Sequence, residues 1–273
     1  MIIAHNINAT KAMNSANEKS IKVSSSSEKL SSGLRINKAG DDAAGLSISE
    51  KMKSQIRGLD QASRNAQDAV SLVQTAEGAM QELNGSLQRI RELWVQREND
   101  TNIKEDRDNI DLEVIQLLEG MDKISETTSF NEKKLIDGSL FDNKFQIGAD
   151  SQQQMSLTID PLDNITLGLP TTMFGPITVP FNPIVDISTI NGALKTVSGE
   201  RSKLGAVQNA LEHAMTNLNN ASENVQAAES RIRDVDMAKE MMSFSKNGIL
   251  MQASQSMLMQ ANQTPQKILE LLK

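Results

Sequence analysis

The stretch MKSQIRGLDQASRNAQDAVSLVQTAEGAMQELNGSLQRIRELW, residues 52–94, repeats apolar residues at every seventh position. A companion apolar row lies three residues behind the first and runs from Ala62 to Ile90. Two rows at this spacing are the a and d positions of a coiled coil. The sequence therefore predicts one continuous helix over residues 45–98, roughly 80 Å long at about 1.5 Å per residue. The first row reads Met52, Leu59, Ala66, Val73, Met80, Leu87 and Trp94.

A second seven-residue repeat runs from Ile190 to Ile232, and only Glu200 interrupts its companion row. Both repeats place small Ala in one row and larger side chains in the other, which lets two helices approach closely. The repeats therefore predict an antiparallel helical bundle, and a shorter apolar run over 103–124 predicts a third helix in it. The side chains expected in the bundle core are Leu59, Val73, Met80, Leu87, Trp94, Val197, Leu204, Leu211, Leu218 and Val225.

Residues 129–185, between the two repeats, have a different composition. Alternating segments at 141–145 and 154–159 predict two short strands of a β-hairpin. Five of the six prolines lie between Pro161 and Pro183, which excludes a long helix there. The sequence thus predicts a mainly α fold, a rod-shaped helical bundle with a small β and irregular region.

The two ends of the chain carry shorter amphipathic patterns. Residues 1–32 show a thin apolar stripe, and residues 237–272 are rich in Met. Such helices are marginal alone, because ordering the backbone costs about 1–2 kcal/mol per residue. We therefore expect each end to fold only on a partner surface. The side chains expected to carry this association are Ile2, Ile7, Ala9, Met13, Val23, Leu30, Met241, Ile249, Leu250, Met257, Leu258, Ile268 and Leu269.

The composition excludes several classes of function. The net charge of −7 provides no basic face for a nucleic acid. The absence of Cys excludes disulfides and thiolate metal sites. No apolar run approaches the roughly 18 residues that span a bilayer, so no membrane partner is expected. The first 19 residues lack a basic segment followed by an apolar one, so a secreted chain would need a route other than a cleavable signal.

No constellation of catalytic residues is visible. His5 and His213 are the only histidines and lack a His-Glu-x-x-His pattern, so neither a metal nor acid–base catalysis is expected. Asp41 and Asp42 precede a long helix and are better explained as N-terminal caps than as a catalytic carboxylate pair. We therefore expect a protein that is not an enzyme and needs no cofactor.

Several motifs at both ends occur together in one order: LSSGLRINKAGDDAAGL at 30–46, LGAVQN at 204–209, AESRIRDVD at 228–236 and QANQTP at 260–265. This set resembles bacterial flagellins over roughly residues 1–140 and 190–273. The resemblance implies a subunit that polymerises with itself into the flagellar filament used for motility. It also implies that 1–44 and 234–273 pair as helices of the inner tube, and that 45–233 form the surrounding shell.

The same resemblance implies export through the flagellar type III apparatus to an extracellular filament. The partners implied are a cytoplasmic export chaperone, the filament cap and the hook-associated proteins. The closest alternative is the hook–filament junction protein, which has related termini. Its acidic motif normally carries Pro where this chain has residues 41–45, so the filament subunit is favoured.

Two groups of residues each allow two interpretations. In some flagellins an innate immune receptor binds the rod, and the matching residues here are Arg89, Leu93 and Glu113. The alternative is that Arg89 and Glu113 form only a surface ion pair worth little energy. Trp94 and Arg97 stand where family members commonly carry small residues. Trp94 is expected either to fill the end of the bundle seam or to contact a neighbouring subunit.

Overall fold

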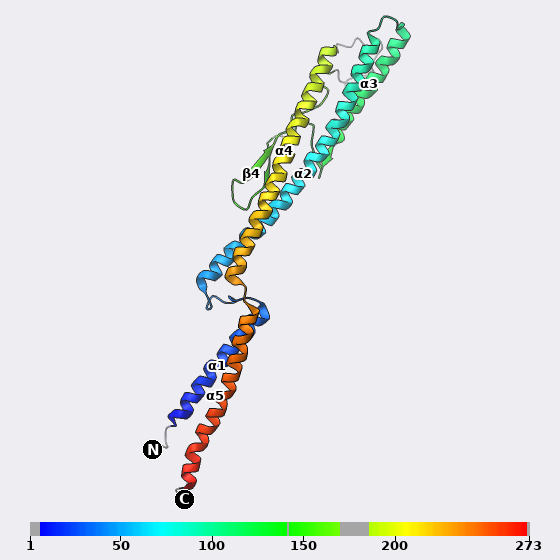
Figure 1. The fold of residues 1–273 in the computed structure, drawn as a ribbon. Helices are drawn as coiled ribbons and strands as arrows, with labels where there is room; N and C mark the ends of the chain where they lie inside the picture. The colour runs from blue at the N-terminus through cyan, green and yellow to red at the C-terminus, as the bar shows by residue number, and fades with distance from the viewer. Residues whose placement is uncertain (1–5, 141, 170–185, 272–273) are drawn as a thin grey trace. The chain divides into compact units, whose positions relative to one another are not determined.

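The computed structural model describes residues 6–140, 142–169 and 186–271, and it confirms the mainly α fold with a small antiparallel strand region (Figure 1). Contacts divide the chain into two compact units. Unit 1 comprises the residues up to Ile56 together with those from Glu223 onwards, and unit 2 comprises Arg57–Ser222. The elements are α1 (Ile7–Ser32), α2 (Ala43–Arg97), α3 (Lys104–Thr127), β1 (Ser129–Phe130), β2 (Lys133–Lys134), β3 (Asn143–Gln146), β4 (Gln154–Leu157), α4 (Ile187–Arg233) and α5 (Met237–Leu271).

The domain boundaries predicted at 44/45 and 233/234 fall at the ends of helices. The 44/45 boundary lies two residues after the start of α2, and the 233/234 boundary lies at the end of α4. The compact units divide within these helices instead, so both α2 and α4 contribute residues to each unit. The helix over 45–98 was predicted to within two residues at its start and one at its end.

The core of unit 2 is built from α2, α3 and α4, which lie side by side in Figure 1. The apolar rows of the two repeats face this core, and Val73, Met80, Leu87, Val197 and Leu211 are completely buried. Val225 belongs to unit 1 and is half-buried. The other core predictions are also buried: Leu59, Trp94, Leu204 and Leu218.

Glu200, the break in the second apolar row, is buried with only 5% of its surface exposed. Its carboxylate accepts a hydrogen bond from Lys203 Nζ at 2.5 Å, and this contact raises the pKa of Lys203. The Lys203 side chain is largely exposed and also lies 3.3 Å from Asp160. The ammonium group of Lys203 thus compensates the buried charge of Glu200.

The hairpin of β3 and β4 pairs Asn143 with Leu157 and Gln146 with Gln154. Both strands are shorter than the predicted segments, and Phe141 and residues 170–185 lie outside the described residues. The hairpin is anchored on α2, because Asn65 donates to the Gln146 carbonyl at 3.1 Å. Gly58 permits this approach: a Cβ at that position would lie 2.9 Å from the Ala149 Cβ. Gly58 on α2 therefore leaves room for the turn of the hairpin to pack against the helix.

The segment after β4 covers the open side of α3. Its apolar residues Ile159, Leu162 and Leu169 are buried. Asn164 is also buried and donates to the Leu118 carbonyl on α3 at 3.0 Å. The irregular region is thus part of the core of unit 2, held by a buried amide as well as by apolar contacts.

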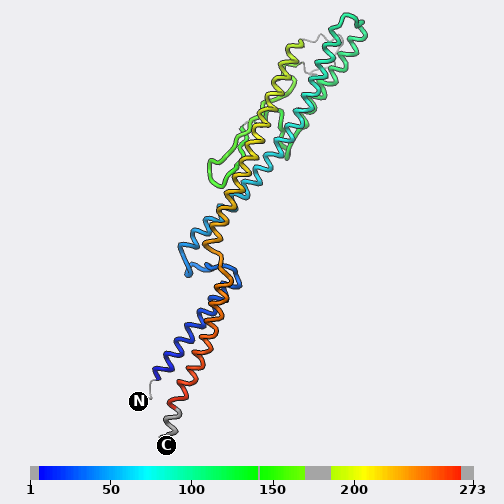
Figure 2. Tube along the Cα trace, in the orientation of Figure 1, coloured from blue at the N-terminus to red at the C-terminus, as the bar shows by residue number. Residues whose placement is uncertain are grey.

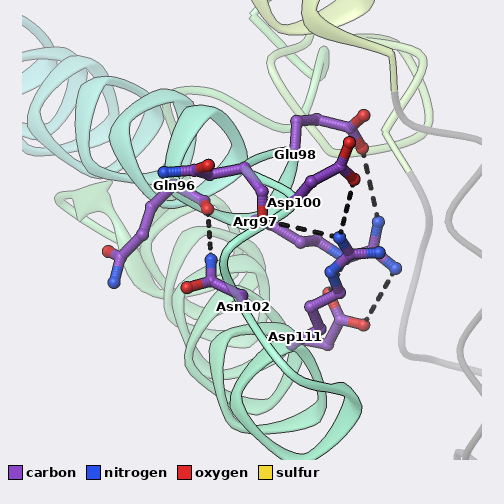
Figure 3. Close-up of polar contacts among 8 residues, drawn as sticks. Gln96, Arg97, Glu98, Asp100, Asn102 and Asp111 are labelled. Atoms are coloured by element: carbon purple, nitrogen blue, oxygen red, sulfur yellow. Dashed lines mark hydrogen bonds and ion pairs between the residues drawn. The ribbon is translucent and has the colours of Figure 1, made fainter.

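The turn between α2 and α3 is held by Arg97, shown in Figure 3. Its Nε and Nη2 atoms donate to the two carboxylate oxygens of Asp111 at 2.6 and 3.2 Å. The guanidinium carbon also lies 4.9 Å from the centroid of the Trp94 ring. Only 5% of the Trp94 surface is exposed. The residue therefore fills the end of the bundle, as the first of the two interpretations expected, and is not available for contact with a neighbouring subunit.

Candidate functional site

Helices α1 and α5 in unit 1 pack along each other in antiparallel directions (Figure 2). The Asn6 side chain, at the start of α1, donates from Nδ2 to the Ala261 carbonyl of α5 at 2.8 Å. Further along, the hydroxyl oxygens of Ser15 and Ser254 lie 3.3 Å apart. Asn6 also caps α1, because its Oδ1 accepts from the Ala9 amide. The two ends of the sequence thus form a helical pair.

The outer surface of α1 retains large apolar side chains that α5 does not cover. Ile7 is 59% exposed, Met13 48% and Ile21 70%. The face turned toward α5 is formed by smaller or partly covered residues, including Ala16, which is buried. Among the predicted association residues, Ala9, Val23 and Leu30 are half-buried, and Ile2 lies outside the described residues.

Helix α5 is apolar on more than one side. Consecutive residues of a helix point about 100° apart, yet both Met241 and Met242 are exposed, as are both Ile249 and Leu250. Leu258 is half-buried, whereas the side chains of Ile268 and Leu269 are not described. These pairs remain exposed although α1 packs along α5, so α1 alone does not cover the helix. The exposed large apolar residues of α5 are Met237, Met241, Met242, Ile249, Leu250, Met257 and Met259.

The turn from α1 to α2 is organised by two carboxylates. The Asp41 Oδ2 accepts from the backbone N–H groups of Lys38 and Asn37 at 3.0 and 3.1 Å. These two donors hold the pKa of Asp41 below its usual value. Asp42 caps α2 by accepting from the Gly45 amide at 2.9 Å. The predicted capping role therefore holds for Asp42, whereas Asp41 stabilises the preceding turn.

The segment that follows α1 pairs with the segment at the end of α4. We call this pairing, of residues 33–35 with residues 233–235, the linker clasp. Leu34 and Asp234 form an antiparallel bridge. The Arg35 amide donates to the Arg233 carbonyl at 2.6 Å, and the Val235 amide donates to the Gly33 carbonyl at 3.1 Å. Sequence analysis missed this contact, because no periodicity connects segments about 200 residues apart. The only signal was that both segments belong to the quoted motifs.

The predicted receptor patch is only partly at the surface. Arg89 donates from Nη2 to Glu113 at 2.8 Å, and both side chains are about half exposed. Leu93, in contrast, is 2% exposed and belongs to the core of unit 2. The expectation that Leu93 forms part of a surface site is wrong, because it points into the bundle on the apolar side of α2. Any contact between a receptor and this patch therefore involves Arg89 and Glu113.

The part of the chain that the structure describes offers neither a metal site nor a membrane span. Within residues 6–140, 142–169 and 186–271, no three His, Cys, Asp or Glu residues are grouped so that they could hold an ion. None of the described helices is long and apolar enough to cross a bilayer. His213 is exposed on α4, and His5 lies outside these residues. The distinctive surface that remains is the apolar one on α1 and α5.

Comparison with known proteins gives matches over both ends. A family described as the bacterial flagellin N-terminal helical region matches residues 3–140, and the bacterial flagellin C-terminal helical region matches residues 187–272. A flagellin of Halalkalibacterium halodurans is 53% identical, and one of Bacillus subtilis is 47% identical, each with both chains fully covered. The crystal structure of Bacillus cereus flagellin aligns with a TM-score of 0.48 and 29% identity, covering 61% of this chain and 94% of that one.

Proposed function

Because the chain belongs to the bacterial flagellin family, we propose that its apolar terminal helices become ordered by packing against neighbouring copies as the filament grows. The chain is a structural subunit that assembles into the homopolymeric flagellar filament outside the cell, and it is not an enzyme. The relatives reported above are named as flagellins, which favours the filament subunit over the hook–filament junction protein. The finer mechanism, in which folding and assembly are coupled, is the proposal.

The observation that carries the proposal is the apolar surface of α5 that α1 leaves uncovered: seven of its large apolar side chains are exposed. An exposed apolar surface of this kind typically marks a site of contact with another protein. Only five of the 35 residues of α5 are charged: Lys239, Glu240, Lys246, Lys267 and Glu270. The remaining sides are therefore suited to burial against other copies, where the contact energy offsets the entropy of ordering the helix.

The distribution of charge between the units supports the same arrangement. Unit 1 contains 14 Lys and Arg residues against 11 Asp and Glu, whereas unit 2 contains 14 against 24. Copies of unit 1 can therefore pack together without a large like-charge repulsion. The acidic unit 2 keeps the free subunit soluble before assembly.

A single carboxylate within the apolar surface tests this proposal. Ile249 is 67% exposed, so Ile249→Glu leaves the free subunit intact but forces a charge into the contact between copies. We expect the critical concentration for seeded polymerisation to rise by about 100-fold. The control is Gln74→Glu, which adds the same charge at an exposed polar position of α2 in unit 2, outside the proposed contact, and is expected to change the critical concentration by about threefold or less. Equal effects of the two variants would contradict the proposal.

Microscopy of purified subunit added to filament fragments separates the two assembly types. A filament subunit extends the fragments into long uniform tubes, whereas a junction protein stops after a thin ring.

The proposed partners other than the subunit itself are the export chaperone, the filament cap and the hook-associated proteins. Before export the same α5 surface is exposed, and flexible Met side chains suit it to binding a chaperone and later neighbouring copies.

A host innate immune receptor is a further proposed partner, bound at Arg89 and Glu113. Arg side chains are enriched among residues that dominate binding energy, so Arg89→Ala is expected to reduce receptor activation by monomer about tenfold or more. The fold should be unaffected, because an exposed ion pair contributes about 0–1 kcal/mol. Arg91→Ala, an exposed neutralisation on the same helix, is the control. Unchanged activation by Arg89→Ala in a cell reporter assay would argue against this site.

A further inference from the structure

The C-terminus of α4 is closed by a residue from the opposite end of the chain. The last carbonyl groups of a helix have no partner within the helix. Arg35, in the link between α1 and α2, supplies two donors to them. Its Nη2 donates to the Ile232 carbonyl at 2.5 Å, and its amide donates to the Arg233 carbonyl at 2.6 Å. The guanidinium charge also complements the negative end of the helix dipole.

The links on both sides of this contact are fixed by local caps. Helix α1 ends at Gly33, whose φ of 71° lies in the left-handed region and whose amide donates to the Lys29 carbonyl. Helix α5 begins after Asp236, which accepts from the Lys239 amide at 3.1 Å. Between these caps, the linker clasp joins the residues that follow α1 to those that precede α5.

The clasp is also tied to the first turns of α2. Arg233 donates to the Glu50 carboxylate at 2.6 Å, and Lys53 lies 3.8 Å from Glu229. Ile36, next to the clasp, is 1% exposed, and Gly45 leaves it room, since a Cβ there would lie 2.8 Å from the Ile36 side chain. The end of α4 therefore has a defined position relative to both links.

We propose that Arg35 is a positioning residue for assembly: by closing the end of α4, it holds the links beside α1 and α5 in one register, so that the two helices dock on each other in that register as they become ordered in the filament. This inference rests on the proposed packing of α1 and α5 between copies. Without the Arg35 side chain, the clasp keeps its backbone hydrogen bonds but loses the guanidinium contact with the Ile232 carbonyl. The links then hold the two helices less firmly in register, which adds an ordering cost when each subunit assembles.

The test measures the critical concentration for seeded polymerisation of the full-length chain. We expect Arg35→Ala to raise it about tenfold, the size of one charge-assisted interaction, and Arg35→Lys to restore part of the loss. Arg231→Ala is the matched control, because it removes an exposed positive charge from the same last turn of α4, and we expect it to stay near wild type. Fluorescence of Trp94, the only Trp, checks that unit 2 remains folded in each variant.

A disulfide distinguishes loss of register from general damage. Leu34 and Asp234 oppose each other in a non-hydrogen-bonded pair, for which the Cα separation is about 4.5 Å and suits a disulfide. The chain contains no Cys, so Leu34→Cys with Asp234→Cys can form only this intramolecular bridge. Oxidation of this pair within Arg35→Ala is expected to restore polymerisation, and reduction to abolish the rescue.

Two outcomes would overturn the role of Arg35. One is an Arg35→Ala chain with the wild-type critical concentration, and the other is a loss that the oxidised bridge does not repair. Either result leaves the proposed packing of the terminal helices in place. That proposal fails instead if a chain ending at Asp236 still extends the seeds, whatever Arg35 does.

Discussion

A chain that ends at Asp236 is expected to lose polymerisation completely while unit 2 keeps its fold. The deletion removes α5 and with it seven exposed large apolar side chains. Burial of these side chains between copies contributes on the order of 10 kcal/mol per subunit at about 1.5 kcal/mol each. Because unit 2 comprises Arg57–Ser222, its core loses nothing. Sedimentation of seeded samples measures assembly, and Trp94 fluorescence reports on the fold of unit 2.

The control for this deletion keeps the apolar surface and changes only its flexibility. Met241, Met242, Met257 and Met259 are replaced together by Leu, which nearly conserves volume. This full-length variant is expected to polymerise, whereas the truncated chain is not. If the truncated chain formed filaments, the surface of α5 would not be the assembly surface. The truncation is also expected to abolish chaperone binding, which a pull-down with the export chaperone measures.

Replacement of Arg97 by Ala is expected to destabilise unit 2 by about 3 kcal/mol. Asp111 is 6% exposed as a residue and makes a two-point contact with Arg97, so the substitution leaves a buried carboxylate without its countercharge. It also removes the cation that lies over the Trp94 ring. Urea unfolding followed by circular dichroism measures the change in the free energy of unfolding.

A paired substitution separates the loss of the contact from the cost of the remaining charge. Arg97→Met together with Asp111→Leu replaces the ion pair by apolar side chains of similar size. Such replacements are often neutral or stabilising, so we expect the double variant to unfold near the wild-type midpoint. A single Arg97→Ala variant as stable as wild type would show that the pair does not hold the α2–α3 turn.

The bundle could be predicted from sequence because its signal extends over many residues. Val73, Met80 and Leu87 repeat at the interval that one helix face requires, and all three are fully buried. The same rows indicated where α2 begins and ends to within two residues. Glu200 was recognised as a break, and its partner Lys203 follows three residues later on the same helix, whereas the contact of Lys203 with Asp160 joins two segments that no pattern in the sequence connects.

The features that could not be predicted depend on contacts between distant segments. Leu93 was placed at the surface because the motif was read along the chain, whereas the direction of its side chain is set by the packing of α2 in unit 2. The strands of the hairpin are shorter than their alternating segments, because pairing ends at Asn143 with Leu157. The linker clasp joins Arg35 to the carbonyl of Arg233, and neither local propensity nor periodicity indicates such a pair.

The sequence predicted that α5 has an apolar surface, but not which side of the helix α1 covers. The Met-rich composition indicated an association surface, and Met241, Ile249 and Met257 are indeed exposed. Composition alone could not tell which side α1 covers, because that side is set by contacts such as the one between Asn6 and the Ala261 carbonyl.

Amide hydrogen exchange of α1 and α5, compared between free subunit and filament, tests the coupling of folding and assembly most directly. Helices with so much uncovered apolar surface open readily when isolated. We therefore predict fast exchange throughout both helices at high dilution and slow exchange in the filament, with unit 2 protected in both states. Strong protection of both terminal helices in the dilute free subunit would contradict the account, because ordering would then precede assembly.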